Sequence, residues 1–183
     1  MATKAPPMTA QEFEKYSLLP ENSGRRLELI GGEVVELLPD ECSRRMTIRF
    51  ARLVKAYLDQ HPIGYATPPG IGYKVGNDRY MPDIGFVRKA RQPFPPKASY
   101  NSLAPDLVFE VVSPTDQMDH ILAKVMNYRL ASAMVWVVYP GSKEIQVFAP
   151  GQPSKKLGIG DTLDGGTVLP GFAAKLADIF AGE

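Results

Sequence analysis

A glutamate inside an apolar strand is the first residue of this sequence whose setting points to chemistry. Residues 107–112 read Leu-Val-Phe-Glu-Val-Val, and near-continuous apolarity of this kind is typical of a strand covered on both faces. Alternation along the strand places Glu110 on the side of Val108 and Val112. A buried ionised carboxylate needs a metal, a cation or several hydrogen bonds to replace its lost water. The sequence therefore indicates a metal site at Glu110.

Asp83 has a similar setting. It follows Pro82 and starts a predicted strand, on the face opposite Ile84 and Phe86. Aspartate is depleted within strands, so one placed just inside a strand either forms a turn or serves a site. Together with Glu110 it gives two carboxylates from neighbouring strands, and hard oxygen ligands of this kind suit a divalent cation.

Lys124 supplies the third group of the expected site. Glu110 should lie roughly 10 Å before the end of its strand, and Lys124 roughly 15 Å along the helix that folds back over the sheet. A lysine side chain can therefore reach Glu110, although an exposed lysine would give the same pattern. His120, Lys124 and Tyr128 share one stripe of that helix because they are four residues apart.

The elements that must position these groups follow from caps, turns and periodicity. A capping box begins at Thr9, Gly31-Gly32 suits a tight hairpin turn, and Ser113 with Pro114 offers a helix start. The expected fold class is α/β or α+β, a mixed β-sheet flanked by helices with an N-terminal β-hairpin. The predicted helices cover residues 9–16, 43–60 and 115–130; the predicted strands cover residues 26–30, 33–37, 71–75, 80–87, 107–112, 134–139 and 144–149, with short strands and a helical turn within 155–180.

Composition points to one globular domain of ordinary size. The chain has 183 residues, of which 44% are hydrophobic, so residues 1–183 are expected to form a single domain with a flexible start at 1–8. Lys plus Arg number 21 and Asp plus Glu 20, so there is no global basic excess of the kind common in small nucleic-acid binders. The single cysteine, Cys42, excludes a disulfide framework within the chain. No segment is apolar enough to span a membrane, and a cytoplasmic location is expected.

The order and spacing of several motifs resemble the Uma-two family, a restriction-endonuclease-like family of the PD-(D/E)XK nuclease superfamily. The resemblance covers most of the chain and implies a restriction-endonuclease-like fold. Its motifs are Leu27-Glu28-Leu29-Ile30-Gly31-Gly32-Glu33, Met81-Pro82-Asp83, residues 104–114 around Glu110, Lys124 with Tyr128, Trp136-Val137-Val138-Tyr139-Pro140, and Leu169-Pro170-Gly171-Phe172.

This resemblance implies a metal-dependent nuclease in which Asp83 and Glu110 hold Mg²⁺ or Mn²⁺. In the usual superfamily pattern the catalytic lysine stands two residues after the glutamate, where this chain has Val112. The Uma-like pattern takes the lysine from the following helix instead, as at Lys124. The chain thus departs from the superfamily at one position and follows the family.

Two further features of the resemblance concern residues outside that trio. Glu28 would be an additional acid near the metal, although Glu33 and Glu36 of the same hairpin are alternatives. Relatives often carry a histidine at the start of the second helix, where this chain has Ser43-Arg44-Arg45-Met46. The two histidines that the chain does contain are expected at the surface or in caps rather than as ligands.

The expected function is hydrolysis of phosphodiester bonds in nucleic acid, above all DNA, by a metal-activated water. Lys124 would position the nucleophile or offset charge on the phosphate. Arg45, Arg49 and Arg52 share a helix face that could bind nucleic acid or could simply be solvated. Two alternatives stay open, an inactive nuclease fold that binds nucleic acid and a homo-oligomeric interaction module. A homodimer is expected by analogy with restriction-type folds.

Overall fold

The computed structural model of the protein describes residues 7–98 and 100–183. Its helices are α1 (Ala10–Ser17), α2 (Glu41–Gln60), α3 (Met118–Leu130) and α4 (Leu176–Ile179), with a 3-10 turn, η1 (Pro20–Asn22). Its strands are β1 (Leu27–Ile30), β2 (Glu33–Glu36), β3 (Gly64–Thr67), β4 (Gly72–Val75), β5 (Asp78–Tyr80), β6 (Ile84–Arg88), β7 (Tyr100–Asn101), β8 (Leu107–Val111), β9 (Met134–Tyr139), β10 (Glu144–Phe148), β11 (Lys155–Leu157), β12 (Thr162–Asp164) and β13 (Ala173–Lys175). The expected mixed α+β architecture is confirmed.

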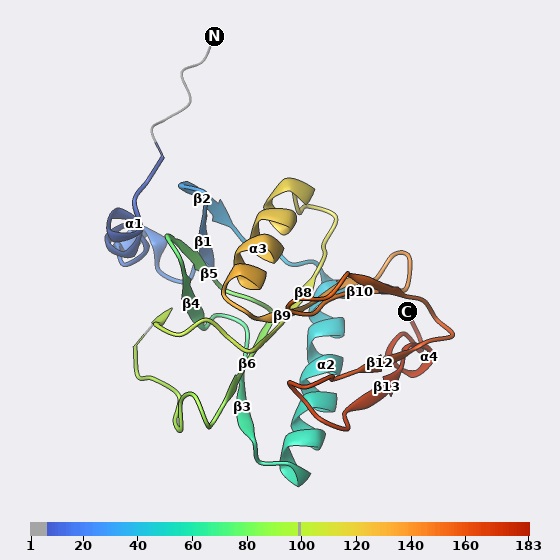
Figure 1. Ribbon diagram of the computed structural model, residues 1–183. Coiled ribbons are helices and arrows are strands. Elements are labelled where there is room, and N and C mark those ends of the chain that lie inside the picture. Colours follow the sequence, from blue (N-terminus) through green and yellow to red (C-terminus); the bar gives the residue numbers. More distant parts are fainter. Residues whose placement is uncertain (1–6, 99) are drawn as a thin grey trace.

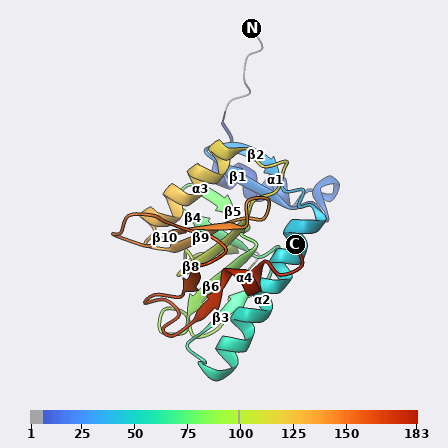
Figure 2. The same ribbon diagram turned by 90° about the vertical axis from the view of Figure 1, so that its right-hand side faces the viewer.

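A six-stranded sheet, ordered β11-β10-β9-β8-β6-β3, lies between the two long helices, and Figures 1 and 2 show α2 and α3 on different sides of it. Strands β8 and β9 run parallel, whereas the other neighbours are antiparallel. Phe109 packs with Phe50 of α2 at a ring distance of 5.2 Å. Val108 packs in a second cluster with Val125 of α3. The predicted alternation along β8 is therefore confirmed, and Glu110 faces the α3 side.

A second sheet, ordered β2-β1-β5-β4-β7, is built on the N-terminal hairpin. Gly31 and Gly32 have φ values of 58° and 84°, the left-handed backbone that a tight primed turn requires, so the predicted hairpin is confirmed. The Met8 N–H donates to the Gly32 carbonyl at 2.8 Å, which connects residue 8 to the turn. Residues 1–6 of the expected flexible start lie outside the described residues.

The strand predicted over residues 80–87 is wrong, because the structure divides it between the two sheets. Residues 78–80 form β5, which pairs with β1 and β4, whereas residues 84–88 form β6, which pairs with β3 and β8. Pro82 lies in the break, where its missing N–H takes no bond away from a strand ladder. Asp83 therefore sits at the point where the chain passes from one sheet to the other.

The helix that carries Lys124 begins at Met118, three residues later than predicted. Ser113 does not cap it; instead the Ser113 N–H donates to the Asp116 carboxylate at 2.7 Å and the Asp116 N–H to the Ser113 carbonyl at 3.1 Å. These bonds close a turn and compete with helix formation. Strands β3 and β7 were not predicted. No helix of the described residues is long and apolar enough to cross a membrane.

Candidate active site

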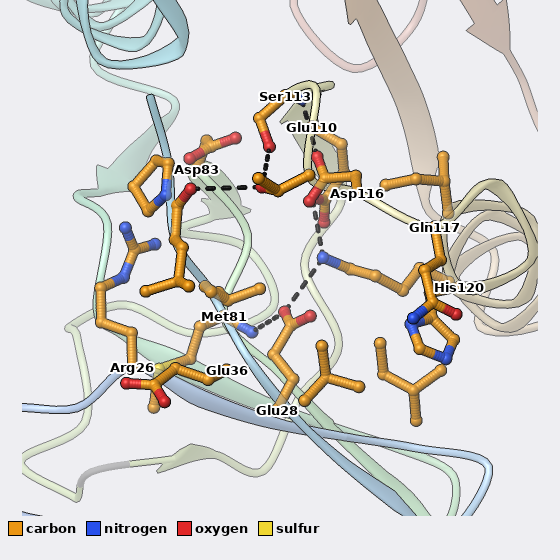
Figure 3. Close-up of a pocket in the computed structure, with 18 of the residues that line it drawn as sticks. Arg26, Glu28, Glu36, Met81, Asp83, Glu110, Ser113, Asp116, Gln117 and His120 are labelled. Carbon is orange, nitrogen blue, oxygen red and sulfur yellow. Dashed lines mark hydrogen bonds and ion pairs between the residues drawn. The ribbon is translucent and has the colours of Figure 1, made fainter. Parts of the chain in front are cut away.

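Asp83 and Glu110 come together because β6 and β8 are paired neighbours. Asp83 immediately precedes β6, and its Oδ2 accepts a 2.9 Å hydrogen bond from the N–H of Val111, the residue after Glu110. Both carboxylates line one pocket of about 190 Å³. Figure 3 shows Asp83, Glu110 and Ser113 among the residues that line this pocket. The structure thus brings together the two residues that were predicted to hold a metal.

Lys124 reaches into the same pocket from α3. Its Nζ donates to Glu110 Oε2 at 2.7 Å and lies 3.0 Å from Glu28 Oε1, with only 4% of the lysine side chain exposed. The alternative of an exposed lysine is therefore wrong, and the predicted contact between Lys124 and Glu110 is observed. Whether Lys124 takes part in catalysis stays a prediction.

Glu28 of β1 is the hairpin glutamate that joins the site. Its side chain is fully buried, and its Oε1 accepts a 2.6 Å hydrogen bond from the Met81 N–H as well as contacting Lys124. Glu36 instead pairs with Arg25 at 2.6 Å, and Glu33 lies 3.9 Å from His120. Among the alternatives, Glu28 is thus the one within contact of the lysine.

Burial and charge oppose one another in this cluster. Burial raises the pKa of Glu110 to about 8, although the ammonium of Lys124 works against this shift. Burial also raises the pKa of Asp83, opposed by the Val111 N–H and by Lys124. For Lys124, burial alone would lower the pKa, but Glu110 and Glu28 outweigh it, so the net shift is upward. Lys124 therefore stays an ammonium at neutral pH, while Glu110 binds a proton more readily than an exposed glutamate.

The donor set of the pocket fits a hard divalent cation. Glu28 Oε2 and Glu110 Oε1 are buried and have no hydrogen-bond partner among the described residues. Unsatisfied buried oxygens of this kind are costly unless a ligand or ion compensates for them. Within the described chain, no group of three or more His, Cys, Asp or Glu residues is arranged to hold a metal. Two carboxylates are nevertheless enough for Mg²⁺, which usually keeps several waters and binds substrate phosphate oxygens.

Comparison with known proteins shows the family and the fold of this chain. Residues 11–177 match the model of the Uma2 family, described as "Putative restriction endonuclease". The chain belongs to the Uma2 family. A crystal structure of "a putative nuclease belonging to DUF820" from Anabaena variabilis superimposes with a TM-score of 0.83 at 19% sequence identity, covering 95% of this chain and 98% of that one. That identity shows the shared fold alone. A search among curated proteins found no match.

Several residues of this Uma2 pocket were not predicted from the sequence. Arg26, Ser113, Asp116 and His120 also line it. Asp116 and Ser113 follow the end of β8, and this position just beyond the strand of Glu110 is a signal that could have identified them. Arg26 precedes the hairpin and carries no comparable signal, because its place depends on how the two sheets pack.

The predicted nucleic-acid face of α2 lies away from the pocket of this Uma2 chain. Arg45 and Arg49 contact the Glu183 carboxylate at 3.0 and 3.5 Å, and Arg49 also donates to the carbonyls of Ile179 and Ala181. Neither these arginines nor Arg52 lines the pocket. Arg45 and Arg49 thus bind the C-terminal segment. A role for all three arginines in binding nucleic acid stays a prediction.

The two histidines have different settings. His61 is the C-cap of α2 and stacks on Tyr57 at a ring distance of 4.4 Å, as expected for a capping residue. His120 lies in the pocket lining, and its side chain is only 18% exposed. The expected capping position is therefore observed for His61, whereas His120 is a partly exposed residue of the pocket lining.

Proposed function

We propose that this protein is a metal-dependent nuclease that hydrolyses phosphodiester bonds in nucleic acid, above all DNA. The observation that carries the proposal is the convergence of Asp83, Glu110 and the buried ammonium of Lys124 in one pocket. One oxygen of Glu110 has no hydrogen-bond partner in the part of the chain that the structure describes. Membership of a family described as putative restriction endonucleases supports the same reaction class.

Asp83 and Glu110 would hold Mg²⁺ or Mn²⁺ through their carboxylate oxygens. When bound, such a cation acidifies water and offsets negative charge on the phosphate during hydrolysis. The Val111 N–H fixes the Asp83 carboxylate, and Lys124 fixes that of Glu110. These contacts preorganise both acids before the substrate arrives, which is the condition for effective electrostatic stabilisation.

Lys124 acts in this proposal as a fixed positive charge. Since its pKa is raised, it does not serve as a base at neutral pH. Glu28 and Glu110 both contact the ammonium, so the positive charge is held in the pocket. There it offsets the two acids and orients the attacking water.

The test is cleavage of supercoiled plasmid, linear DNA and RNA by the pure protein in Mg²⁺ or Mn²⁺. We expect Asp83→Asn and Glu110→Gln each to lower the rate about 100-fold or more, the order of loss seen when a preorganised charge-stabilising group is removed. Asp59→Asn, which removes an exposed acid paired with Lys55 on α2, is the matched control and should leave the rate unchanged.

Cleavage that survives both active-site substitutions, or that persists in EDTA, would contradict the proposal. A protein that binds nucleic acid but never cleaves it would instead be the inactive nuclease fold. The expected homodimer is checked in the same samples by light scattering, since one chain has a mass of 20.1 kDa.

A further inference from the structure

A second groove, of about 580 Å³, opens beside the acidic pocket. The two share part of their lining, including Arg26, Leu38 and Asp83. The far side of the groove is formed by α2, through Arg44 and Ile48. Its volume lies within the roughly 300–1,000 Å³ typical of ligand sites. A ligand in the acidic pocket can therefore continue along this groove, which we call the arginine groove.

Positive charge distinguishes the arginine groove from the acidic pocket. Its lining carries Arg25, Arg26 and Arg44 against two acids, Glu36 and Asp83. Arg25 is committed, because it donates to Glu36 Oε2 at 2.6 Å. Arg44 is exposed on α2. The groove thus offers guanidinium groups directly beside a pocket whose own carboxylates repel a phosphate.

Arg26 stands where the groove and the pocket meet. Its Nε is buried and has no hydrogen-bond partner among the described residues. Figure 3 shows Arg26 and Glu36 on the side of the pocket opposite Gln117 and His120. A planar guanidinium binds phosphate oxygens in a bidentate manner. Because Arg26 lines both cavities, its guanidinium is placed to meet a phosphate that lies beside the carboxylates.

Apolar side chains complete the groove. Leu38 and Ile48 are 64% and 54% exposed, and Pro39 and Pro69 also line the cavity. Guanidinium groups next to exposed apolar surface match the two parts of a nucleotide, its charged phosphate and its flat base. Bases are accessible to such surfaces only when they are unpaired, as in single strands.

We propose that the arginine groove binds a single strand of nucleic acid next to the hydrolysed bond. Arg26 holds the phosphate nearest the carboxylates, Arg44 holds a following phosphate, and Leu38 and Ile48 contact an unpaired base. This inference rests on the proposed function and names the substrate class as strands with unpaired bases. It also places the binding surface on a different face of α2 from Arg45, Arg49 and Arg52.

The test is the affinity of the protein for a short fluorescein-labelled DNA single strand, measured by fluorescence anisotropy in EDTA over a range of KCl concentrations. We expect Arg26→Gln and Arg44→Gln each to weaken binding about 10-fold, as for a lost hydrogen bond to a charged group. Each should also lower the slope of log K against log salt by about 0.7, the contribution of one phosphate contact on a single strand. Arg26→Lys should keep the slope, because it keeps the charge.

Arg129→Gln is the matched control, since Arg129 is exposed on α3 outside the groove lining and has no predicted part in binding. Groove variants that leave the salt slope unchanged, an effect of Arg129→Gln as large as theirs, or a duplex that binds more tightly than the single strand would each overturn the inference. If the wild-type protein cleaves no substrate but the groove variants bind the single strand more weakly, only the proposed hydrolysis is contradicted. If the wild-type protein cleaves nucleic acid but the groove variants bind as tightly as wild type, only the groove inference is contradicted.

Discussion

Lys124 is a buried ammonium held between Glu110 and Glu28. An intact buried ion cluster contributes little net stability. Removing one of its members is nevertheless strongly destabilising, because the remaining charges stay buried without compensation. Asp83 adds a third acid to the same pocket. The lysine therefore lowers the cost of burying these acids in one pocket, whatever its part in catalysis.

We expect Lys124→Met to lower the free energy of unfolding by about 3–5 kcal/mol, because both glutamates lose their cation while the apolar stem is kept. Urea denaturation measures this loss. Lys55→Met is the control, since Lys55 forms an exposed pair with Asp59 on α2 and should change stability by less than about 1 kcal/mol. An equally small effect of Lys124→Met would show that the two glutamates do not depend on its charge.

The contact between Lys124 and Glu110 could be predicted from the sequence because both lie on consecutive elements, a strand and the helix that returns over it. The burial of Arg26 Nε could not be predicted from the sequence. Spacing also could not show which of Glu28, Glu33 and Glu36 joins the site. Those positions depend on how the N-terminal hairpin packs against segments far along the chain, for example where the Met81 N–H donates to Glu28, 53 residues away in the sequence. No local pattern carries that long-range information.

Individual elements were predicted where periodicity or turn chemistry was strong. Helix α2 and the hairpin at Gly31-Gly32 belong to this class. Strands β3 and β7 contain four and two residues, too few for a readable alternation. The run across Pro82 looked continuous because residues on both sides favour strand, and only sheet pairing separates β5 from β6.

Strand β6 approaches the second sheet so closely that Gly85 has no room for a side chain. A Cβ added there would lie 2.6 Å from the hydroxyl oxygen of Tyr73, a buried tyrosine that shares a 2.7 Å hydrogen bond with Thr67. Asp83 lies two residues before Gly85 and immediately precedes β6, so the position of this strand determines where Asp83 lies. Close packing at Gly85 therefore helps to fix a carboxylate of the site.

We expect Gly85→Ala to destabilise the protein by about 1–3 kcal/mol, the usual cost of overpacking, and to lower nuclease activity by displacing Asp83. Thermal unfolding and plasmid cleavage measure the two effects. Gly141→Ala is the control, because a Cβ at Gly141 meets no atom of the described residues within 4 Å. A Gly85→Ala protein as stable as the Gly141→Ala protein would disprove the close contact.

The stability of the whole molecule should depend on pH through Glu110. Its pKa is raised from 4.5 to about 8 in the folded protein, mainly by burial. Between these values the folded state keeps a proton that the unfolded state has released, so the free energy of unfolding falls as pH rises. Asp83, whose pKa is also raised, acts in the same direction.

We therefore expect wild-type protein to lose stability relative to Glu110→Gln as pH rises from about 5 to about 8, by at most about 1.4 kcal/mol per pH unit. Urea denaturation at several pH values gives the comparison. Glu144→Gln should keep the wild-type trend, because Lys156 and Ser142 lower the pKa of the Glu144 carboxyl rather than raise it. Parallel curves for wild type and Glu110→Gln would rule out a retained proton at Glu110.

The ammonium of Lys124 joins parts of the molecule that share no strand pairing. Glu28 belongs to the five-stranded sheet, Glu110 to the six-stranded sheet, and the lysine to the helix between them. The ammonium of Lys124 thus links the two sheets and the helix at the pocket. The relative position of the two sheets and the geometry of the pocket therefore depend on the same contacts of Lys124. A change in one is expected to alter the other.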